Sequence, residues 1–169
     1  MSGVRVRIRQ PQPSDLPELS ALYNHYVVSS PVTFDIEPFE IEQRRAWFDH
    51  YAPVGRHQLF VADSDGSVVG YATSSAFRGK PAYDPSVETT VYVAAGLTGQ
   101  GIGARLYRAL FDSLEKEDVH RAYAGITVPN PASLALHRSF GFHPVGLYDE
   151  VGRKFGRFWS VEWLEKKLP

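Results

Sequence analysis

The sequence contains no cysteine among its 169 residues. This absence excludes disulfide bonds, a thiolate nucleophile and cysteine-bound zinc, and it is typical of proteins of the reducing cytoplasm. An excess of basic charge is also absent, because 18 Lys and Arg residues face 19 Asp and Glu residues. Nucleic acids and anionic membranes recruit proteins through such an excess. We therefore expect a cytoplasmic protein that binds neither nucleic acid nor a membrane.

A long apolar segment is the third feature that the sequence lacks. Its longest uncharged stretches, Thr89–Ala104 and Ala122–His137, are interrupted by Gly or Pro and fall short of the about 20 apolar residues that span a bilayer. Arginines within Met1–Gln10 likewise interrupt what would be the apolar core of a signal peptide. The length and the 43% hydrophobic content suit one core, so we expect residues 1–169 to form a single domain.

The first half of the chain predicts antiparallel strands and two helices. Apolar residues alternate with arginines at the start, which indicates a strand with Arg5, Arg7 and Arg9 on its solvent face. Turn residues between two later apolar runs predict a hairpin. The expected elements are a strand at Val4–Ile8, a helix capped by Ser14 that continues to Tyr26, a helix over Glu40–Tyr51 with Ile41, Trp47, Phe48 and Tyr51 facing inward, and a hairpin of Leu59–Ala62 with Val68–Ser75.

The second half predicts a β-α-β unit followed by a shorter helix and two strands. A strand, a glycine-rich turn, a helix and a strand follow one another, so the two strands of this unit should be parallel. The expected elements are strands at Val87–Val93 and Ala122–Val128 around a helix over Gly101–Glu117, then a helix over Pro131–Phe140 and strands near Pro144–Tyr148 and Phe155–Trp163.

The glycine-rich turn Thr98–Ala104 is a candidate anion-binding site, because free backbone N–H groups collect where a helix begins. Its glycines also fit a dinucleotide-binding fingerprint, but that motif belongs to the first β-α-β unit of a longer doubly wound fold. A P-loop is excluded because no Gly-Lys-Ser or Gly-Lys-Thr follows the turn. The third interpretation is a cradle for the diphosphate of coenzyme A.

Two motifs resemble those of the GNAT N-acetyltransferases. Thr98-x-x-Gly101-x-Gly103 is similar to the Gln/Arg-x-x-Gly-x-Gly/Ala signature of that superfamily, and Asn130-x-x-Ser133-x-x-x-His137-x-x-x-Gly141-Phe142 is similar to its second motif. Within the superfamily, the chain resembles the phosphinothricin acetyltransferase branch over about residues 5–168. The segments that carry this likeness are Asn24-His25-Tyr26, Ala82-Tyr83-Asp84, Val87–Val93, Leu134–Arg138 and Val151–Arg157.

This resemblance implies the GNAT fold and acetyl-CoA as the acetyl donor. No metal is expected, because the histidines other than His137 show no metal-ligand spacing. The fold is an α/β (α+β) domain with a mixed, mostly antiparallel sheet of about seven strands and about four helices. Its strands at Val87–Val93 and Ala122–Val128 are expected to be parallel and splayed. The residues expected to bind acetyl-CoA are Val91, Val93, Thr98, Gly99, Gln100, Gly101, Ile102, Gly103, Ala104, Asn130 and Ser133.

Three residues are expected to act in catalysis. Alternation places Glu88 on one face of its strand with Thr90 and Tyr92, and the resemblance assigns Glu88 the role of general base, acting directly or through water. The residues alone would favour a salt-bridged strand carboxylate, and the resemblance reverses that preference. The resemblance makes His137 the proton donor to the departing thiolate, against the alternative of a histidine on the helix surface. It also makes the backbone N–H of Val93 the oxyanion donor.

The resemblance further places Phe34, Arg78, Tyr83 and Tyr92 in the pocket for the acyl acceptor. Arg78 suits a carboxylate or phosphinate, because its guanidinium can bind both oxygens, although a solvated loop charge is an equal interpretation of this residue. Some positions depart from the family pattern. Thr98 stands where Gln or Arg is usual, and Phe158, Ser160 and Glu165 stand where this branch has Trp, Asp and Gln.

The sequence thus predicts an N-acetyltransferase that acts by direct transfer on a small amino acid-like amine of the phosphinothricin or methionine sulfoximine type. Two alternatives remain open. In the first alternative, the acceptor is a protein N-terminus or a polyamine. In the second, the chain is a non-catalytic acyl-CoA-binding sensor. A homodimer is expected from the resemblance, with the aromatic residues Phe155, Phe158, Trp159 and Trp163 as core or subunit contacts.

Overall fold

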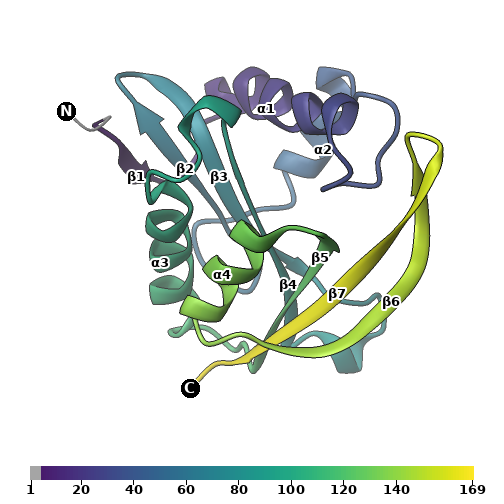
Figure 1. Cartoon of the computed structure of the whole chain (residues 1–169). Helices are drawn as coiled ribbons and strands as arrows, with labels where there is room; N and C mark the ends of the chain where they lie inside the picture. The colour runs from purple at the N-terminus through teal and green to yellow at the C-terminus, as the bar shows by residue number, and fades with distance from the viewer. Residues whose placement is uncertain (1–4) are drawn as a thin grey trace.

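Seven strands form one mixed sheet in the computed structural model, which describes residues 5–169 (Figure 1). The strand order is β1-β2-β3-β4-β5-β7-β6. All neighbouring strands are antiparallel except β4 and β5, which are parallel, so the expected sheet is confirmed. The strands are β1 (Arg7–Arg9), β2 (Leu59–Ser64), β3 (Ser67–Ala76), β4 (Ser86–Val93), β5 (Arg121–Val128), β6 (His143–Lys154) and β7 (Arg157–Lys167).

Helices cover both faces of this sheet. On one face α1 (Leu16–Ser29) and α2 (Ile41–Phe48) pack against side chains such as Val61 and Tyr71. The other face carries α3 (Ile102–Leu114) and, next to it, α4 (Pro131–Ser139) (Figure 1). Within residues 5–169, no helix is long and apolar enough to cross a membrane.

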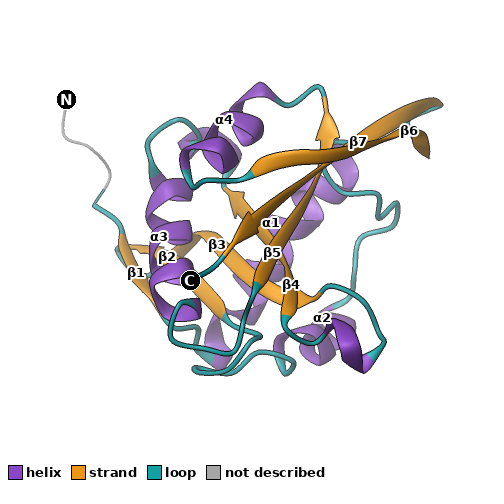
Figure 2. Ribbon diagram, turned by 90° about the horizontal axis from the view of Figure 1, so that it is seen from below, coloured by secondary structure: helices purple, strands orange, loops and turns teal. Residues whose placement is uncertain are grey.

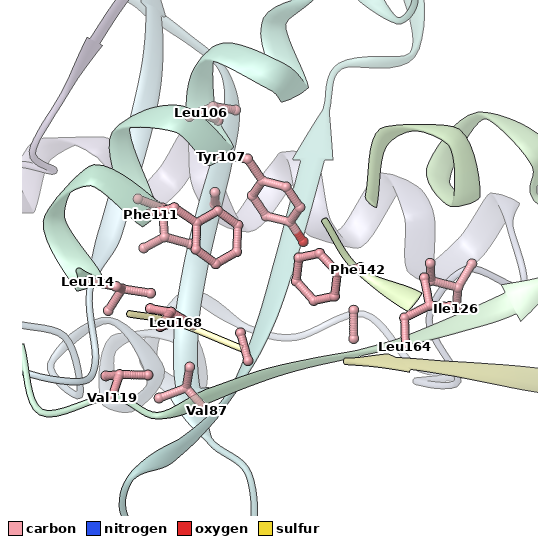
Figure 3. Packing of buried hydrophobic residues seen from close by; sticks show 14 of the residues in the cluster. Val87, Leu106, Tyr107, Phe111, Leu114, Val119, Ile126, Phe142, Leu164 and Leu168 are labelled. Carbon is pink, nitrogen blue, oxygen red and sulfur yellow. The ribbon is translucent and has the colours of Figure 1, made fainter. Parts of the chain in front are cut away.

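The larger core lies beneath α3, as Figure 3 shows. Its helical stripe is buried as the spacing predicts, since Leu106, Leu110 and Leu114 are fully shielded from solvent. Tyr107 is also fully buried and packs edge-on against Phe111. The core therefore fixes the start of α3, and with it the glycine-rich turn, against the sheet.

The parallel pair β4 and β5 diverges after a short ladder. Pairing covers only Ser86–Glu88 on β4 and Arg121–Tyr123 on β5. The residues that follow on both strands line a cavity instead of pairing with each other. The divergence is therefore confirmed, and it leaves backbone groups of β4 without a strand partner on that side.

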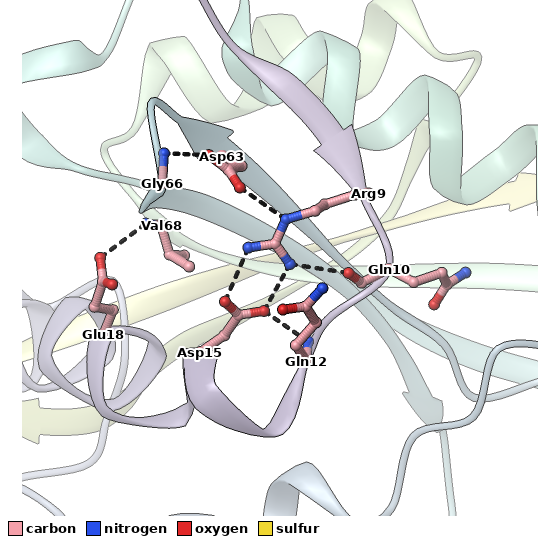
Figure 4. Close-up of polar contacts among 8 residues, drawn as sticks. All are labelled: Arg9, Gln10, Gln12, Asp15, Glu18, Asp63, Gly66 and Val68. Atoms are coloured by element: carbon pink, nitrogen blue, oxygen red, sulfur yellow. Dashed lines mark hydrogen bonds and ion pairs between the residues drawn. The ribbon is translucent and has the colours of Figure 1, made fainter.

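An ion-pair cluster fastens the first strand to the rest of the fold (Figure 4). The guanidinium of Arg9 binds Asp15 before α1 and Asp63 on β2, with N–O distances of 2.8 Å to each carboxylate. The contact with Arg9 holds the pKa of the Asp15 carboxyl below its ordinary value. Arg9 therefore belongs to a largely buried cluster, and its assignment to the solvent face was wrong.

Element boundaries differ from the predictions at several points. Asp15, not Ser14, is the N-cap of α1, because a 3-10 turn over Pro13–Asp15 precedes that helix. Helix α2 is shorter than predicted and leaves Ile41 exposed. Val4 lies outside the described residues.

The last two strands were predicted much too short. They form a long hairpin around a tight turn at Phe155 and Gly156, both of which have positive φ values of 53° and 71°. Such values are characteristic of two-residue hairpin turns, so Phe155 is a turn residue rather than the start of a strand. Figure 2 shows this hairpin reaching out from the rest of the sheet.

Candidate active site

Two cavities lie on opposite faces of the sheet and share two lining residues where β4 and β5 diverge. The α3-side cavity has a volume of about 340 Å³ and lies between the diverging strands and the first turns of α3 and α4. The α2-side cavity has a volume of about 400 Å³ and lies beneath α1 and α2. Thr90 and Tyr92 of β4 line both cavities, so molecules bound on the two faces can meet at the divergence.

The glycine-rich turn forms the mouth of the α3-side cavity. Gly99 and Gly101 have φ values of 75° and 76°, a left-handed conformation that glycine adopts without strain. Gly101 is the N-cap of α3, so the first N–H groups of this helix have no partner within it. Every predicted residue of Thr98–Ala104 lines the cavity except Gln100, which is exposed and lies outside it. The turn has the geometry of an anion site.

Alternate N–H groups of β4 point into the divergence. Ala94 donates to the carbonyl of Val69 on the β3 side at 2.9 Å. Because alternate residues of an antiparallel strand bond to the same neighbour, the N–H groups of Val91 and Val93 point to the opposite edge, where β5 has moved away. These predicted residues can therefore offer hydrogen bonds to a molecule in the α3-side cavity. The hydroxyl of Tyr26 meanwhile donates to the carbonyl oxygen of Val93.

Glu88 lies in the α2-side cavity with Thr90 and Tyr92, as strand alternation predicts. Burial raises the pKa of its carboxyl above the ordinary value, whereas the nearby charge of Arg78 lowers that pKa. Glu88 forms no ion pair within residues 5–169, so it is not the salt-bridged strand carboxylate that the residues alone allowed. A half-buried carboxylate with a raised pKa is a candidate general base.

His137 is buried in the α3-side cavity and is not a surface residue, since only 3% of it is exposed. Its Nδ1 lies 2.7 Å from the carbonyl of Ser133, which only accepts, so Nδ1 carries the proton. Its Nε2 therefore accepts from the hydroxyl of Tyr107 at 2.8 Å. Burial lowers the pKa of His137, which favours this neutral form.

Asn130 and Ser133 lie at the start of α4, on the wall of the same cavity. The side-chain oxygen of Asn130 accepts from the N–H of Ser133 at 3.1 Å, which makes Asn130 the N-cap of this helix. The carboxamide NH₂ of Asn130 stays available for other contacts. The hydroxyl of Ser133 lies 3.4 Å from Nδ1 of His137, so these two side chains share one face of α4.

Three predicted acceptor-pocket residues line neither cavity. Arg78 is exposed, and its guanidinium lies over the rings of Phe77 and Trp163 at 4.2 and 5.8 Å. Tyr83 is also largely exposed. Phe34 packs against Gly152 on β6. Tyr92, by contrast, lines the α2-side cavity directly.

Sequence reasoning missed several residues that the fold brings to the two cavities. Tyr107 contacts His137, Tyr26 contacts Val93, and Arg44 lies in the α2-side cavity. For Arg44 the sequence held a usable signal, because it occurs one helical turn before Trp47 and Phe48 on the inner side of α2. The described part of the chain holds no group of three or more side chains suited to bind a metal.

The chain is similar to one known protein family and to named proteins. The family described as "Acetyltransferase (GNAT) family" matches residues 19–142. The chain is 56% identical to a phosphinothricin N-acetyltransferase of Streptomyces coelicolor over 96% of both chains. It is 34% identical to an L-methionine sulfoximine/L-methionine sulfone acetyltransferase of Pseudomonas aeruginosa over 95% of this chain and 94% of that protein.

Solved structures of acetyltransferases are also similar to this chain. A phosphinothricin acetyltransferase of Sinorhizobium meliloti in complex with AcCoA has a TM-score of 0.91 at 29% identity, covering 96% of this chain and 88% of that one. A ribosomal-protein-alanine N-acetyltransferase of Brucella melitensis has a TM-score of 0.90 at 36% identity, covering 96% and 99%.

Proposed function

The chain belongs to the GNAT acetyltransferase family, and on this premise we propose that it transfers acetyl from acetyl-CoA to the amino group of a small amino acid-like molecule. The relatives named for phosphinothricin and methionine sulfoximine support this class of acceptor. The observation that carries the proposal is the pair of cavities that share Thr90 and Tyr92, one with an anion cradle and the other with a carboxylate. Residues 1–169 act as one domain in this proposal.

The donor side is the α3-side cavity. The N–H groups at the start of α3, around Gly101 and Gly103, bind the diphosphate of acetyl-CoA. The N–H group of Val91 binds its pantetheine arm, and Asn130 holds that arm from the opposite wall. The thioester is thereby held at the divergence of β4 and β5.

The acceptor side supplies the base. Glu88 takes a proton from the amine, directly or through water, and the free amine then attacks the thioester carbon. The N–H of Val93 stabilises the resulting oxyanion. The nitrogen of the tetrahedral intermediate loses its second proton to solvent, and the carbon–sulfur bond breaks to leave the amide. The departing thiolate receives the hydroxyl proton of Tyr107 from the hydrogen-bonded pair of His137 and Tyr107. Glu88 and this pair return to their starting states by proton exchange with solvent.

Replacement of Glu88 tests the proposal. Glu88→Gln should lower the rate of amine-dependent thiol release by about 10²- to 10⁴-fold, the usual contribution of a general base. Its affinity for acetyl-CoA should stay unchanged, because Glu88 lies outside the α3-side cavity. Glu115→Gln, which removes an exposed carboxylate after α3, serves as the control and should keep full activity.

The same assay separates the alternatives. The acceptors to compare are phosphinothricin, methionine sulfoximine, common amino acids, polyamines and a peptide. The ribosomal-protein-alanine N-acetyltransferase favours the peptide as the second candidate. If wild-type protein binds acetyl-CoA but releases no thiol with any amine, the proposal fails and the sensor hypothesis replaces it.

The proposal extends to the assembly and location of the enzyme. The β6–β7 hairpin exposes apolar side chains, among them Leu147, Val151 and Phe158, each more than half exposed in the single chain. Apolar clusters of this kind mark protein contacts, and we assign this surface to a second copy of the chain. A cytoplasmic location agrees with a sequence that contains no cysteine.

A further inference from the structure

Among residues 5–169, Arg44 of α2 is a buried cation without an anionic partner. Only 5% of the residue is exposed, and its Nε and Nη2 have no hydrogen-bond partner within these residues. Its guanidinium lies over the rings of Trp47 and Tyr23, 3.6 and 4.5 Å from their centres. Aromatic faces attract a cation, but they leave the N–H donors of the guanidinium group without hydrogen-bond acceptors. A buried charge normally requires a partner of opposite sign.

The surroundings of Arg44 within the α2-side cavity explain why this partner is missing. Two carboxylates, Asp35 and Glu88, line the same cavity, and neither forms an ion pair with Arg44 in the described part of the chain. Asp35 already accepts a hydrogen bond from the hydroxyl of Tyr23. Glu88 lies on β4, where its role as base requires it to face the amine. The cavity thus offers one cation and two carboxylates to a bound molecule.

We propose that Arg44 binds the carboxylate of the amino acid-like acceptor, an inference that rests on the function proposed above. A guanidinium fork matches the two oxygens of a carboxylate, and the rings of Tyr23 and Trp47 hold that fork in place before the substrate arrives. With its carboxylate at Arg44, an α-amino acid presents its ammonium group toward the acidic side of the cavity, where Glu88 lies.

Arg44 suits this role better than Arg78 does. Arg78 is exposed, donates to its neighbour's carbonyl at 3.0 Å and lines neither cavity, so water screens and solvates its charge. The guanidinium of Arg44 is shielded from water and has unused donors, and a charge-assisted hydrogen bond is strongest in such a place. We therefore assign carboxylate recognition to Arg44. The role that remains for Arg78 is its effect on the ionisation of Glu88.

The test compares two acceptors on the same enzyme sample. The first is methionine sulfoximine, and the second is the same amine without its carboxylate. Arg44→Gln should lower kcat/KM for the first by about 10- to 100-fold, the effect of losing hydrogen bonds to a charged group. The second acceptor should change by less than about 3-fold. Arg45→Gln, which removes an exposed arginine paired with Glu42, is the matched control and should leave both values unchanged.

Because both acceptors are measured on one sample, their ratio does not depend on the fraction of folded protein. Arg44→Lys keeps the charge without the fork and should show a smaller loss in the same ratio. Equal losses for both acceptors would mean that Arg44 is only structural and would overturn the inference, as would a selective loss in Arg78→Gln with none in Arg44→Gln. Absence of thiol release in the wild type would instead refute the proposed function itself.

Discussion

At the scale of single residues, the proposed reaction depends on one carboxylate whose protonation is set by its surroundings. Burial raises the pKa of Glu88, and the charge of Arg78 works in the opposite direction. A base must be deprotonated, so activity falls as the pH drops through the pKa of Glu88. Because that pKa is raised, the fall begins at a higher pH than it would for an exposed glutamate.

Removal of Arg78 should shift the fall in activity at low pH, the acid limb of the pH profile, to still higher pH. Arg78→Gln takes away the charge that favours ionised Glu88, so the pKa of Glu88 rises and the limb of kcat/KM shifts to higher pH. The measurement is a pH profile at low and high ionic strength, and salt should reduce the shift because Arg78 is exposed. The titration of the substrate amine is common to both enzymes. Lys80→Gln is the control from the same loop, and an equal or downward shift would contradict the prediction.

At the scale of elements, the β6–β7 hairpin supports the segment between α1 and α2. The ammonium of Lys154 donates to the carbonyls of Ser30 and Thr33 at 2.8 Å each. Gly152 lies under the ring of Phe34 so closely that a Cβ atom there would be 2.2 Å from it. Glycine is therefore required at this position for packing, without any need for a positive φ.

The substitution Gly152→Ala should lower the free energy of unfolding by about 1–3 kcal/mol, the usual cost of overpacking. The ring of Phe34 must move away to make room. Gly146→Ala is the matched control on the same strand, because a Cβ there meets nothing within 4 Å. Chemical denaturation measures both variants. In a Phe34→Ala background the cost of Gly152→Ala should vanish, and a cost that persisted would show that the ring is not its cause.

Sequence patterns predicted some elements well and others poorly, for physical reasons. Helix α3 and strand β4 each bury one regular face, so their periods of 3.6 and 2 are visible in the residues alone. Strand β6 contains register shifts between Pro144 and Gly146 and between Tyr148 and Gly152, which break its alternation. Its exposed apolar side chains remove the contrast between an inner and an outer face, so its full length was hidden.

At the scale of the whole molecule, the proposed dimer depends on the hairpin surface. Leu147 on β6 is 56% exposed in the single chain and belongs to the apolar cluster assigned to a second copy. Leu147→Asp would place a charge inside that contact, where it has no partner.

We therefore expect Leu147→Asp to convert a dimer into a monomer, as measured by light scattering after size-exclusion chromatography. Val54→Asp is the control, because it changes an exposed apolar residue in the segment between α2 and β2, outside the hairpin. A wild-type protein that is monomeric at micromolar concentration would contradict the assignment. So would a Leu147→Asp variant that remains a dimer.

How well a site residue could be predicted depends on whether one local segment of sequence positions it or several distant segments do. The glycine-rich turn and Glu88 are positioned by a single strand and its following helix, so local pattern and family resemblance were enough to find them. Arg44 becomes a binding residue only because Tyr23 of α1 and Trp47 of α2 close over it and Glu88 of β4 lies across the cavity. No stretch of sequence contains that arrangement.

The early end of the β4–β5 ladder makes an opening through the sheet. In the proposed reaction the two reactants approach this opening from opposite faces, so neither one blocks the entrance that the other uses. Each can therefore bind to the free enzyme, and both must be present before reaction occurs. Initial-rate plots for varied donor and acceptor should intersect rather than run parallel, and each product should compete with the reactant of its own side.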